Sequence, residues 1–337
     1  MANLKTNYLG LELKNPVIVG ASSLVSDVDN LKRIEDAGAS AVVYRSLFEE
    51  QIQLERAQMD DEFEEYTERH AEMVTLFPKI EHAGPEEHLH NLRKAREAIS
   101  IPLIASLNAL FKETWVEYAK LIEETGVDGL ELNFYAVPKD DNITGVSIEK
   151  QQVEILKEIK KVVTIPVSIK LSPFYTNPLN FIHDLDGAGA DGFVLFNRFY
   201  QPDISFDTLM HTSSHHLSTE SENRLPMRYA GLLYSHVGAN ICCNSGIHEG
   251  TDVVKMILAG ADCVQVVSTL YQNKISHISK MLKDIELWMD EKKYKSLADF
   301  RGKLSKKNVN DPFVYQRAQY IDLLLKSGDI FKKYPVR

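Results

Sequence analysis

This chain of 337 residues contains few cysteines, no long apolar run and fewer basic than acidic residues. The three cysteines, Cys242, Cys243 and Cys263, stand in apolar runs without the spacing of a zinc or iron–sulfur site. We therefore expect reduced cysteines packed in the core, and no metal. The formal net charge of −10 argues against a nucleic-acid partner, which would need clustered lysine and arginine.

No segment of the sequence resembles a signal peptide or a membrane span. The first twenty residues lack an apolar core behind a basic start, and no apolar run approaches the roughly 18 residues of a spanning helix. These absences predict a soluble, cytoplasmic protein with no membrane partner. Hydrophobic residues make up 44% of the chain, which is enough for one large core of the size found in enzymes.

What the sequence does contain is a repeated unit. A glycine-led tripeptide precedes four apolar runs: "GASAVVY" from Gly38, "GVDGLEL" from Gly126, "GADGFVL" from Gly189 and "GADCVQV" from Gly260. A second type of run alternates with these: "NPVIVGAS" at 15–22, "IPLIASLN" at 101–108, "IPVSIKLS" at 165–172 and "ANICCNSG" at 239–246. Their Val, Ile and Leu content is typical of strands that are buried on both faces.

Amphipathic segments separate these runs, for example at 113–126 and at 147–162, where apolar residues recur at helical spacing. Eight strands, each followed by a helix-containing segment, predict an α/β fold of the (β/α)8 TIM barrel type. A doubly wound open sheet would not produce such even alternation. We expect the barrel over residues 1–305 and a helical tail over 306–337 that packs on the barrel or on a partner subunit.

Two loop insertions interrupt the repeat. Residues 49–85 are strongly acidic and partly helical in pattern, and residues 200–225 are polar and typical of a hairpin or a mobile loop. Both follow strands, so both belong to the carboxyl-end face, where barrel enzymes carry the active site. The histidines His211, His215 and His216 accompany no carboxylate pattern, which indicates a solvated loop rather than a metal site.

The side chains at the strand carboxyl ends are small residues, hydroxyls, amides and cations. They are Ala21, Ser22, Arg45, Ser46, Ser106, Asn108, Asn133, Lys170, Asn197, Arg198, Ser245, Gly246, Ser268 and Thr269. Without a carboxylate pair or a metal-ligand set, this composition predicts a site for an anionic ligand with hydrogen-bonding groups. The loops after the last two strands stand where barrels commonly bind a phosphate.

Lys170 lies among apolar neighbours, where an ammonium group is costly without a negative partner. Three roles are open for it. It could neutralise a flavin that becomes anionic near N1, it could form a Schiff base as in lysine aldolases, or it could pair with a carboxylate of the core.

These motifs together resemble the dihydroorotate dehydrogenase family in its soluble branch. The resemblance runs from "YLGLELKNPVIVGAS" to "YKSLADFRGKLS", and its most specific parts are "ELNF", "IPVSIKLSP", "NSGI", "AGADCVQVVSTLY" and "SLADFRGKL". It implies an FMN oxidoreductase of pyrimidine biosynthesis that acts on CH–CH groups, with hydride passing to flavin N5. It also implies a homodimer with a separate electron acceptor.

The resemblance assigns roles to individual residues. Ala21, Ser22 and Ser106 would border the flavin ring, and Lys170 would lie at its N1/O2 edge and stabilise charge there. Arg45, Ser46 and Asn133 would also contact the cofactor, and Ser245, Gly246, Ser268 and Thr269 would hold the phosphate. Arg45, Asn133, Asn197 and Arg198 would contact the substrate.

One family motif departs from its pattern in this chain. The family reads Asn-x-x-Cys-Pro-Asn after the fourth strand, and that cysteine, or a serine in the membrane-bound branch, removes the substrate proton. Here Ala136 occupies the position of the base and cannot take a proton. A replacement base could come from Tyr135, Tyr175, Tyr200 or a histidine of the 200–225 insertion.

Two further departures concern arginines. Arg45 replaces the family's lysine after the second strand, and Arg198 stands where the family has a hydroxyl residue. They could clamp another carboxylate- or carbonyl-bearing substrate, or form salt bridges at the rim. The sequence therefore leaves two alternatives: a flavin-binding protein with a changed substrate or no turnover, and a lyase or aldolase that uses Lys170 as a Schiff-base nucleophile.

Overall fold

The computed structural model describes residues 2–53, 85–134, 136, 140–198, 202–212, 216–316, 319–326, 328 and 332. Most of the 49–85 insertion, as well as Tyr135, Tyr200 and His215, lies outside these residues.

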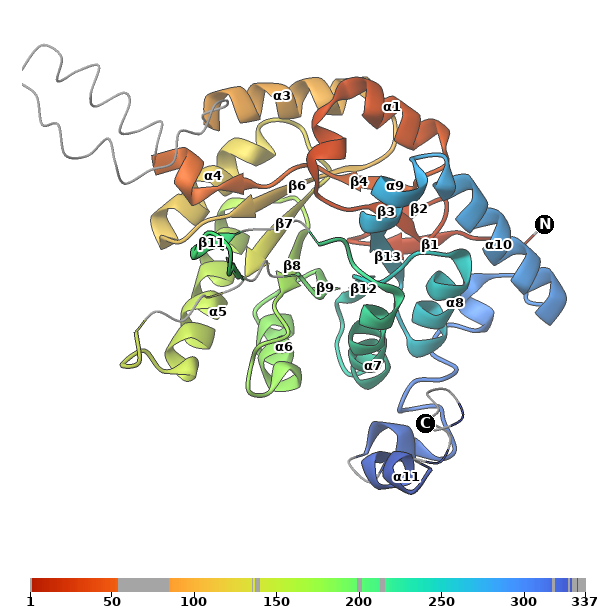
Figure 1. Cartoon of the computed structure of the whole chain (residues 1–337). Helices are drawn as coiled ribbons and strands as arrows, with labels where there is room; N and C mark the ends of the chain where they lie inside the picture. Colours follow the sequence, from red (N-terminus) through yellow and green to blue (C-terminus); the bar gives the residue numbers. More distant parts are fainter. Residues whose placement is uncertain are drawn as a thin grey trace, which may run out of the picture.

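A closed barrel of eight parallel strands forms the centre of the molecule (Figure 1). The strands are β3 (Val17–Val19), β4 (Ala41–Val43), β6 (Leu103–Asn108), β7 (Gly129–Phe134), β8 (Val167–Leu171), β9 (Gly192–Leu195), β12 (Asn240–Asn244) and β13 (Cys263–Val266). The pairing of β4 with β6 closes the circle, and the short β5 (Leu47–Phe48) adds to β6 beyond it. The (β/α)8 TIM barrel predicted from the repeats is confirmed.

Helices surround this barrel and connect its strands (Figure 1). They are α1 (Val28–Asp36), α3 (Pro85–Ala98), α4 (Lys112–Glu123), α5 (Gly145–Val162), α6 (Pro178–Gly187), α7 (Arg224–Leu233), α8 (Gly250–Ala259), α9 (Ser268–Asn273) and α10 (His277–Lys292), with short 3₁₀ turns η1 (Ser23–Ser26) and η4 (Leu297–Asp299). Helix α5 begins at Gly145, earlier than the pattern suggested, because the Thr144 hydroxyl accepts a hydrogen bond from the Ser147 N–H and caps it.

An N-terminal hairpin, which the sequence did not predict, packs at the start of the strands. Its strands β1 (Thr6–Tyr8) and β2 (Leu11–Leu13) are joined by Leu9 and Gly10, whose φ angles of 56° and 73° form a tight turn. Tyr8, Leu9 and Leu13 are buried in one apolar cluster with residues of the barrel strands. Leu9 contacts the first residues of β7 and β9, so the hairpin closes the amino end of the barrel.

The three cysteines are free and buried, as predicted. Cys242 on β12 is the register partner of Cys263 on β13, and burial raises the pKa of the Cys243 and Cys263 thiols well above their usual value. They are therefore packing residues. Within the described ranges, no helix is long and apolar enough to cross a membrane, and no three His, Cys, Asp or Glu side chains gather as a metal site would need.

The 200–225 insertion contains the hairpin that its pattern suggested, followed by helical structure. Strands β10 (Asp203–Ser205) and β11 (Met210–Thr212) pair antiparallel. The segment then forms the 3₁₀ turn η3 (Glu220–Asn223), which leads directly into α7. The helical end follows from Thr219 and Glu222, which form a reciprocal capping box.

The first part of the C-terminal tail packs on α7. The turn η5 (Pro312–Tyr315) is held by Arg228, which donates hydrogen bonds to the carbonyl oxygens of Val314 at 3.2 Å and Tyr315 at 2.9 Å. The Tyr315 hydroxyl donates to the Leu304 carbonyl at 2.6 Å. Helix α11 (Gln319–Leu325) follows, and the division at residue 305 stays a prediction.

The hairpin contact predicts that glycine is needed at the start of β9. A β-carbon at Gly192 would lie 2.8 Å from Leu9 Cδ2 and 3.1 Å from Tyr8 Cε2. Gly192→Ala should therefore lower the free energy of unfolding, measured in urea, by about 1–3 kcal/mol, the usual cost of overpacking. The matched control is Gly187→Ala in α6, where nothing lies within 4 Å of the added carbon. Equal effects of the two substitutions would contradict the packing assignment.

Candidate active site at the barrel mouth

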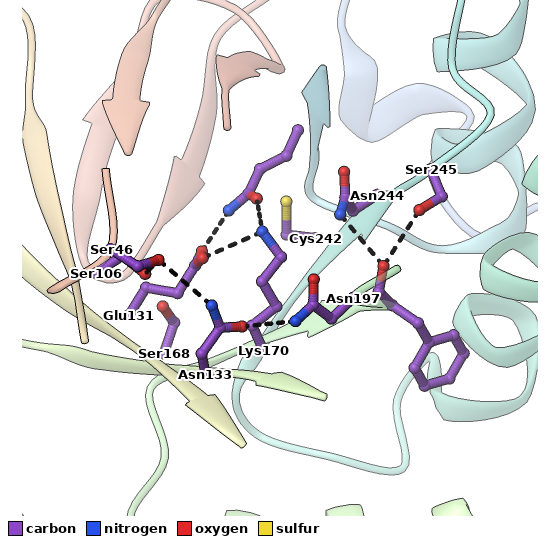
Figure 2. Close-up of polar contacts among 12 residues, drawn as sticks. Ser46, Ser106, Glu131, Asn133, Ser168, Lys170, Asn197, Cys242, Asn244 and Ser245 are labelled. Atoms are coloured by element: carbon purple, nitrogen blue, oxygen red, sulfur yellow. Dashed lines mark hydrogen bonds and ion pairs between the residues drawn. The ribbon is translucent and has the colours of Figure 1, made fainter. Parts of the chain in front are cut away.

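Predicted site residues from four strands form one hydrogen-bonded chain at the carboxyl ends (Figure 2). The Ser46 and Ser106 hydroxyls lie 2.7 Å apart, and Asn133 Nδ2 lies 3.4 Å from the Ser46 oxygen. Asn197 Nδ2 donates to Asn133 Oδ1 at 3.1 Å. The barrel thus brings together side chains from the ends of β4, β6, β7 and β9, as the repeat pattern predicted.

Lys170 lies beside this chain and is in register with Asn133. Its ammonium nitrogen lies 3.3 Å from Glu131 Oε1 and donates a hydrogen bond to Gln265 Oε1 at 3.1 Å (Figure 2). Gln265 Nε2 in turn donates to Glu131 Oε2 at 2.5 Å. The Glu131 side chain is 0% exposed and that of Lys170 is 7% exposed. Glu131, Lys170 and Gln265 therefore form a closed, buried triangle, which we call the charge triangle.

Sequence reasoning missed two corners of this triangle. Glu131 stands in "GLELNF" and Gln265 in "CVQV", where they are the polar residues of runs read as apolar. The available signal was the strand period of two, because Glu131 and Asn133 alternate with leucine and so face the same side. The geometry is that of the third role considered for Lys170, a pair with a core carboxylate. A Schiff-base nucleophile must be a neutral amine that is free to attack, whereas the Lys170 nitrogen is held by Glu131 and Gln265.

Three loops converge where the phosphate was expected. Ser245 and Gly246 have φ angles of 76° and 68°, which form a sharp bend after β12. A β-carbon on Gly246 would lie 2.3 Å from the backbone nitrogen of Asn223, so the loop can carry only glycine there. The N–H of Ser218 donates to the Ser268 hydroxyl at 2.9 Å. The segment 218–223 thus contacts both predicted phosphate loops. The sequence placed the 200–225 insertion on this face but did not single out these residues.

Thr269 makes a different contact from the one expected. Its hydroxyl donates to the His248 carbonyl at 3.0 Å and accepts from Asn273 Nδ2 at 3.2 Å, and its side chain is fully buried. The hydroxyl therefore fastens the start of α9 to the loop before α8. Thr269 as a whole is 0% exposed, so its contacts are those of a residue that supports the loop from within.

The two predicted arginines have different surroundings. Arg198 Nε lies 3.1 Å from Glu222 Oε1, and its Nη1 donates to the His216 carbonyl, so it ties the segment 216–223 to the end of β9. Arg45 is half-buried at the end of β4, and its charge acts on His88. Burial, followed by the charge of Arg45, lowers the pKa of His88 to about 4, so this ring is neutral at pH 7.

The candidates for a replacement base are not strengthened by the structure. Ala136 is exposed and lies two residues beyond the end of β7. The Tyr175 hydroxyl donates to Gln152 Oε1 at 2.9 Å, and burial raises the pKa of this phenol. Its ring packs against Phe181, so Tyr175 is a packing residue. His211 and His216 are exposed, and Tyr135 and Tyr200 lie outside the described residues.

A cavity of about 1090 Å³ opens at the edge of this site. Its wall includes Asn197, Asn244 and Ser245 at the barrel mouth, and it extends along α7 to Leu258 and Tyr315. The Asn244 amide and the Ser245 hydroxyl both donate to the Phe196 carbonyl, at 3.2 and 3.3 Å, and so fix the wall of the cavity nearest to the strands (Figure 2).

Comparison of the sequence with known proteins places this chain in a family. The model of the family described as dihydroorotate dehydrogenase matches residues 3–289. The chain is similar to proteins named dihydroorotate dehydrogenase B (NAD(+)), catalytic subunit, from several organisms. The protein of Thermoplasma volcanium is 28% identical over 307 residues, which cover 90% of this chain and 98% of the relative. The protein of Methanocaldococcus jannaschii is 26% identical over 297 residues, which cover 86% of this chain and 94% of the relative. The protein of Shouchella clausii is 23% identical over 309 residues, which cover 90% of this chain and 98% of the relative. As its motifs predicted, the chain belongs to the dihydroorotate dehydrogenase family of FMN-dependent oxidoreductases.

Proposed function

We propose that this protein binds FMN across the mouth of the barrel and uses it to oxidise or reduce a C–C bond of an anionic substrate. The observation that carries the proposal is Lys170, a buried ammonium at the end of β8 beside a chain of hydroxyls and amides. A flavin ring offers the carbonyl and N–H groups that such a chain can bind, and it gains negative charge on reduction.

Several polar atoms at the mouth fit a ligand of this kind. The Ser22 hydroxyl and Asn108 Nδ2 are buried at the ends of β3 and β6, and neither has a hydrogen-bond partner in the described structure. Buried polar groups are rarely left unpaired, so these atoms support binding of a group rich in donors and acceptors. The converging loops at Ser218, Gly246 and Ser268 would surround the phosphate.

The chain's own residues would have distinct tasks around the cofactor. FMN, when bound, supplies a hydride acceptor at N5. Lys170 would offset negative charge at the N1/O2 edge, and Ala21, Ser22 and Ser106 would border the ring. Asn133 and Asn197, joined by their hydrogen bond at 3.1 Å, would orient the substrate or the ring edge.

The relatives' name suggests dihydroorotate as the first substrate to test and indicates that further subunits complete those enzymes. We propose that this chain likewise passes electrons to a separate acceptor protein and forms a homodimer in the cytoplasm. Arg45 and Arg198 would clamp an anionic substrate. For Arg198 this requires exchange of the Glu222 partner for the ligand.

The second candidate function is flavin binding with a changed substrate or with no turnover. It is favoured by Ala136, because a general base typically contributes 10² to 10⁴-fold to the rate and alanine contributes nothing. Dihydroorotate oxidation by this chain should accordingly be slow. The two candidates share the cofactor and differ in whether substrate reduces it.

The first prediction of the proposal concerns the cofactor. The purified protein should show flavin absorption, and Lys170→Ala should lower FMN occupancy or slow the bleaching of the flavin by an anaerobic reductant, because it removes the ammonium near N1. The spectrum and the bleaching rate measure this. The control is Lys160→Ala, which removes a lysine whose partner is Asp191, at 2.6 Å. A colourless protein that takes up no added FMN would overturn the proposal.

Replacing Ala136 by cysteine would restore a proton acceptor at the position of the family's base. Ala136→Cys should raise the rate at which dihydroorotate bleaches the bound flavin, by on the order of 10²-fold or more, since it supplies a proton acceptor at the family's position. Ala136→Val has no such acceptor and is the control. If cysteine gives no more bleaching than valine, dihydroorotate is not the substrate, and the changed-substrate candidate is favoured.

A further inference from the structure

We propose that Glu131, held by Gln265, is a positioning residue that sets the reduction potential of the flavin by acting through Lys170. This inference rests on the proposed function, because it needs FMN at the barrel mouth. It assigns a task to a buried carboxylate that the proposed chemistry does not use directly.

Glu131 precedes Asn133 by two residues on β7, so both side chains point into the barrel and Glu131 lies one layer deeper. Lys170 is in register with Asn133, in the layer nearer to the mouth. The three corners of the charge triangle come from β7, β8 and β13, so the triangle crosses the barrel interior (Figure 2).

An ammonium or a carboxylate that is buried alone costs several kcal/mol, whereas the two together carry no net charge. Glu131 therefore compensates the charge of Lys170 inside the barrel. Gln265 fixes the geometry, because it accepts from Lys170 through Oε1 and donates to Glu131 through Nε2.

A gain in stability explains the ion pair between Glu131 and Lys170 poorly. Apolar residues of similar size often stabilise a core as well as a buried ion pair or better. The remaining residues of this interior include Val194, Ile18 and Cys242, which show that the barrel accepts apolar side chains beside the triangle. Glu131 Oε1 makes the ion pair but has no hydrogen-bond partner in the described structure, which also makes the arrangement costly.

A flavin beside Lys170 would meet a positive charge that Glu131 partly cancels. Loss of the carboxylate charge should expose the full charge of Lys170 and favour the reduced flavin, and loss of the ammonium should do the opposite. Glu131 thus keeps the potential lower than an unpaired lysine would.

The experiment is a redox titration of bound FMN in wild type and in Glu131→Gln, with dithionite as reductant and a reference dye. Glutamine keeps the size and a hydrogen bond to Gln265 but removes the charge. We expect the ratio of reduced to oxidised flavin at a fixed potential to rise tenfold or more, a shift of about 30 mV or more in the midpoint of a two-electron couple. An unchanged or lower midpoint would overturn the inference.

Two variants separate this role from simple packing. Glu49 is also buried, but its carboxylate binds Gln53, Thr114 and the Leu110 N–H, so Glu49→Gln removes a buried charge outside the triangle and should leave the midpoint unchanged. Glu131→Asp keeps the charge, and its midpoint should lie closer to that of wild type than the midpoint of Glu131→Gln does. A midpoint of Glu131→Asp equal to that of Glu131→Gln would show that packing, and not charge, matters.

If Glu131→Gln loses FMN or unfolds, the coupling between Glu131 and Lys170 is tested by stability instead. In that case Glu131→Gln/Lys170→Met, which removes both charges, should be more stable in urea than Glu131→Gln alone, because the unpaired ammonium is gone. A double variant no more stable than the single one would refute the coupling. Wild type without FMN would refute the proposed function instead, so the two failures are distinguishable.

Discussion

The ion pair between Glu131 and Lys170 is the interaction around which the candidate site is organised. Both side chains are almost fully buried, and each would be costly without the other. The pair can exist only because β7 and β8 are neighbours and Gln265 reaches it from β13. The barrel therefore does more than gather side chains at one end, since it also holds opposite charges at a fixed spacing inside an apolar wall.

The same closure explains why residues far apart in sequence act together. Ser46 and Asn133 are 87 positions apart, and Ser218 and Ser268 are 50 positions apart, yet each pair is in hydrogen-bond contact. The polar chain borders one side of the mouth, and the converging loops border the side expected for a phosphate. Arg198, tied to Glu222, joins the end of β9 to the segment that covers the Gly246 bend.

The barrel and the strand-end residues were predictable because glycine-led apolar runs repeat along the chain, and strand ends in a parallel barrel share one face. The N-terminal hairpin was not, because strands of three residues carry almost no periodic signal. The sequence signals for the hairpin were Gly129 and Gly192, because both lack a side chain where Leu9 packs. Glu131 and Gln265 were missed because their polar partners come from strands distant in sequence, and such pairing is invisible before the strands are placed. The FMN contacts of individual residues stay predictions.

The closed amino end of the barrel has a consequence for water. Tyr8, Leu9 and Leu13 are each at most 3% exposed at that end, so side chains of the hairpin cover the interior beneath Glu131. Any change in hydration of the buried ions must then come through the opposite opening. Whatever molecule covers that opening sets the local dielectric constant, and with it the strength of every charge interaction inside.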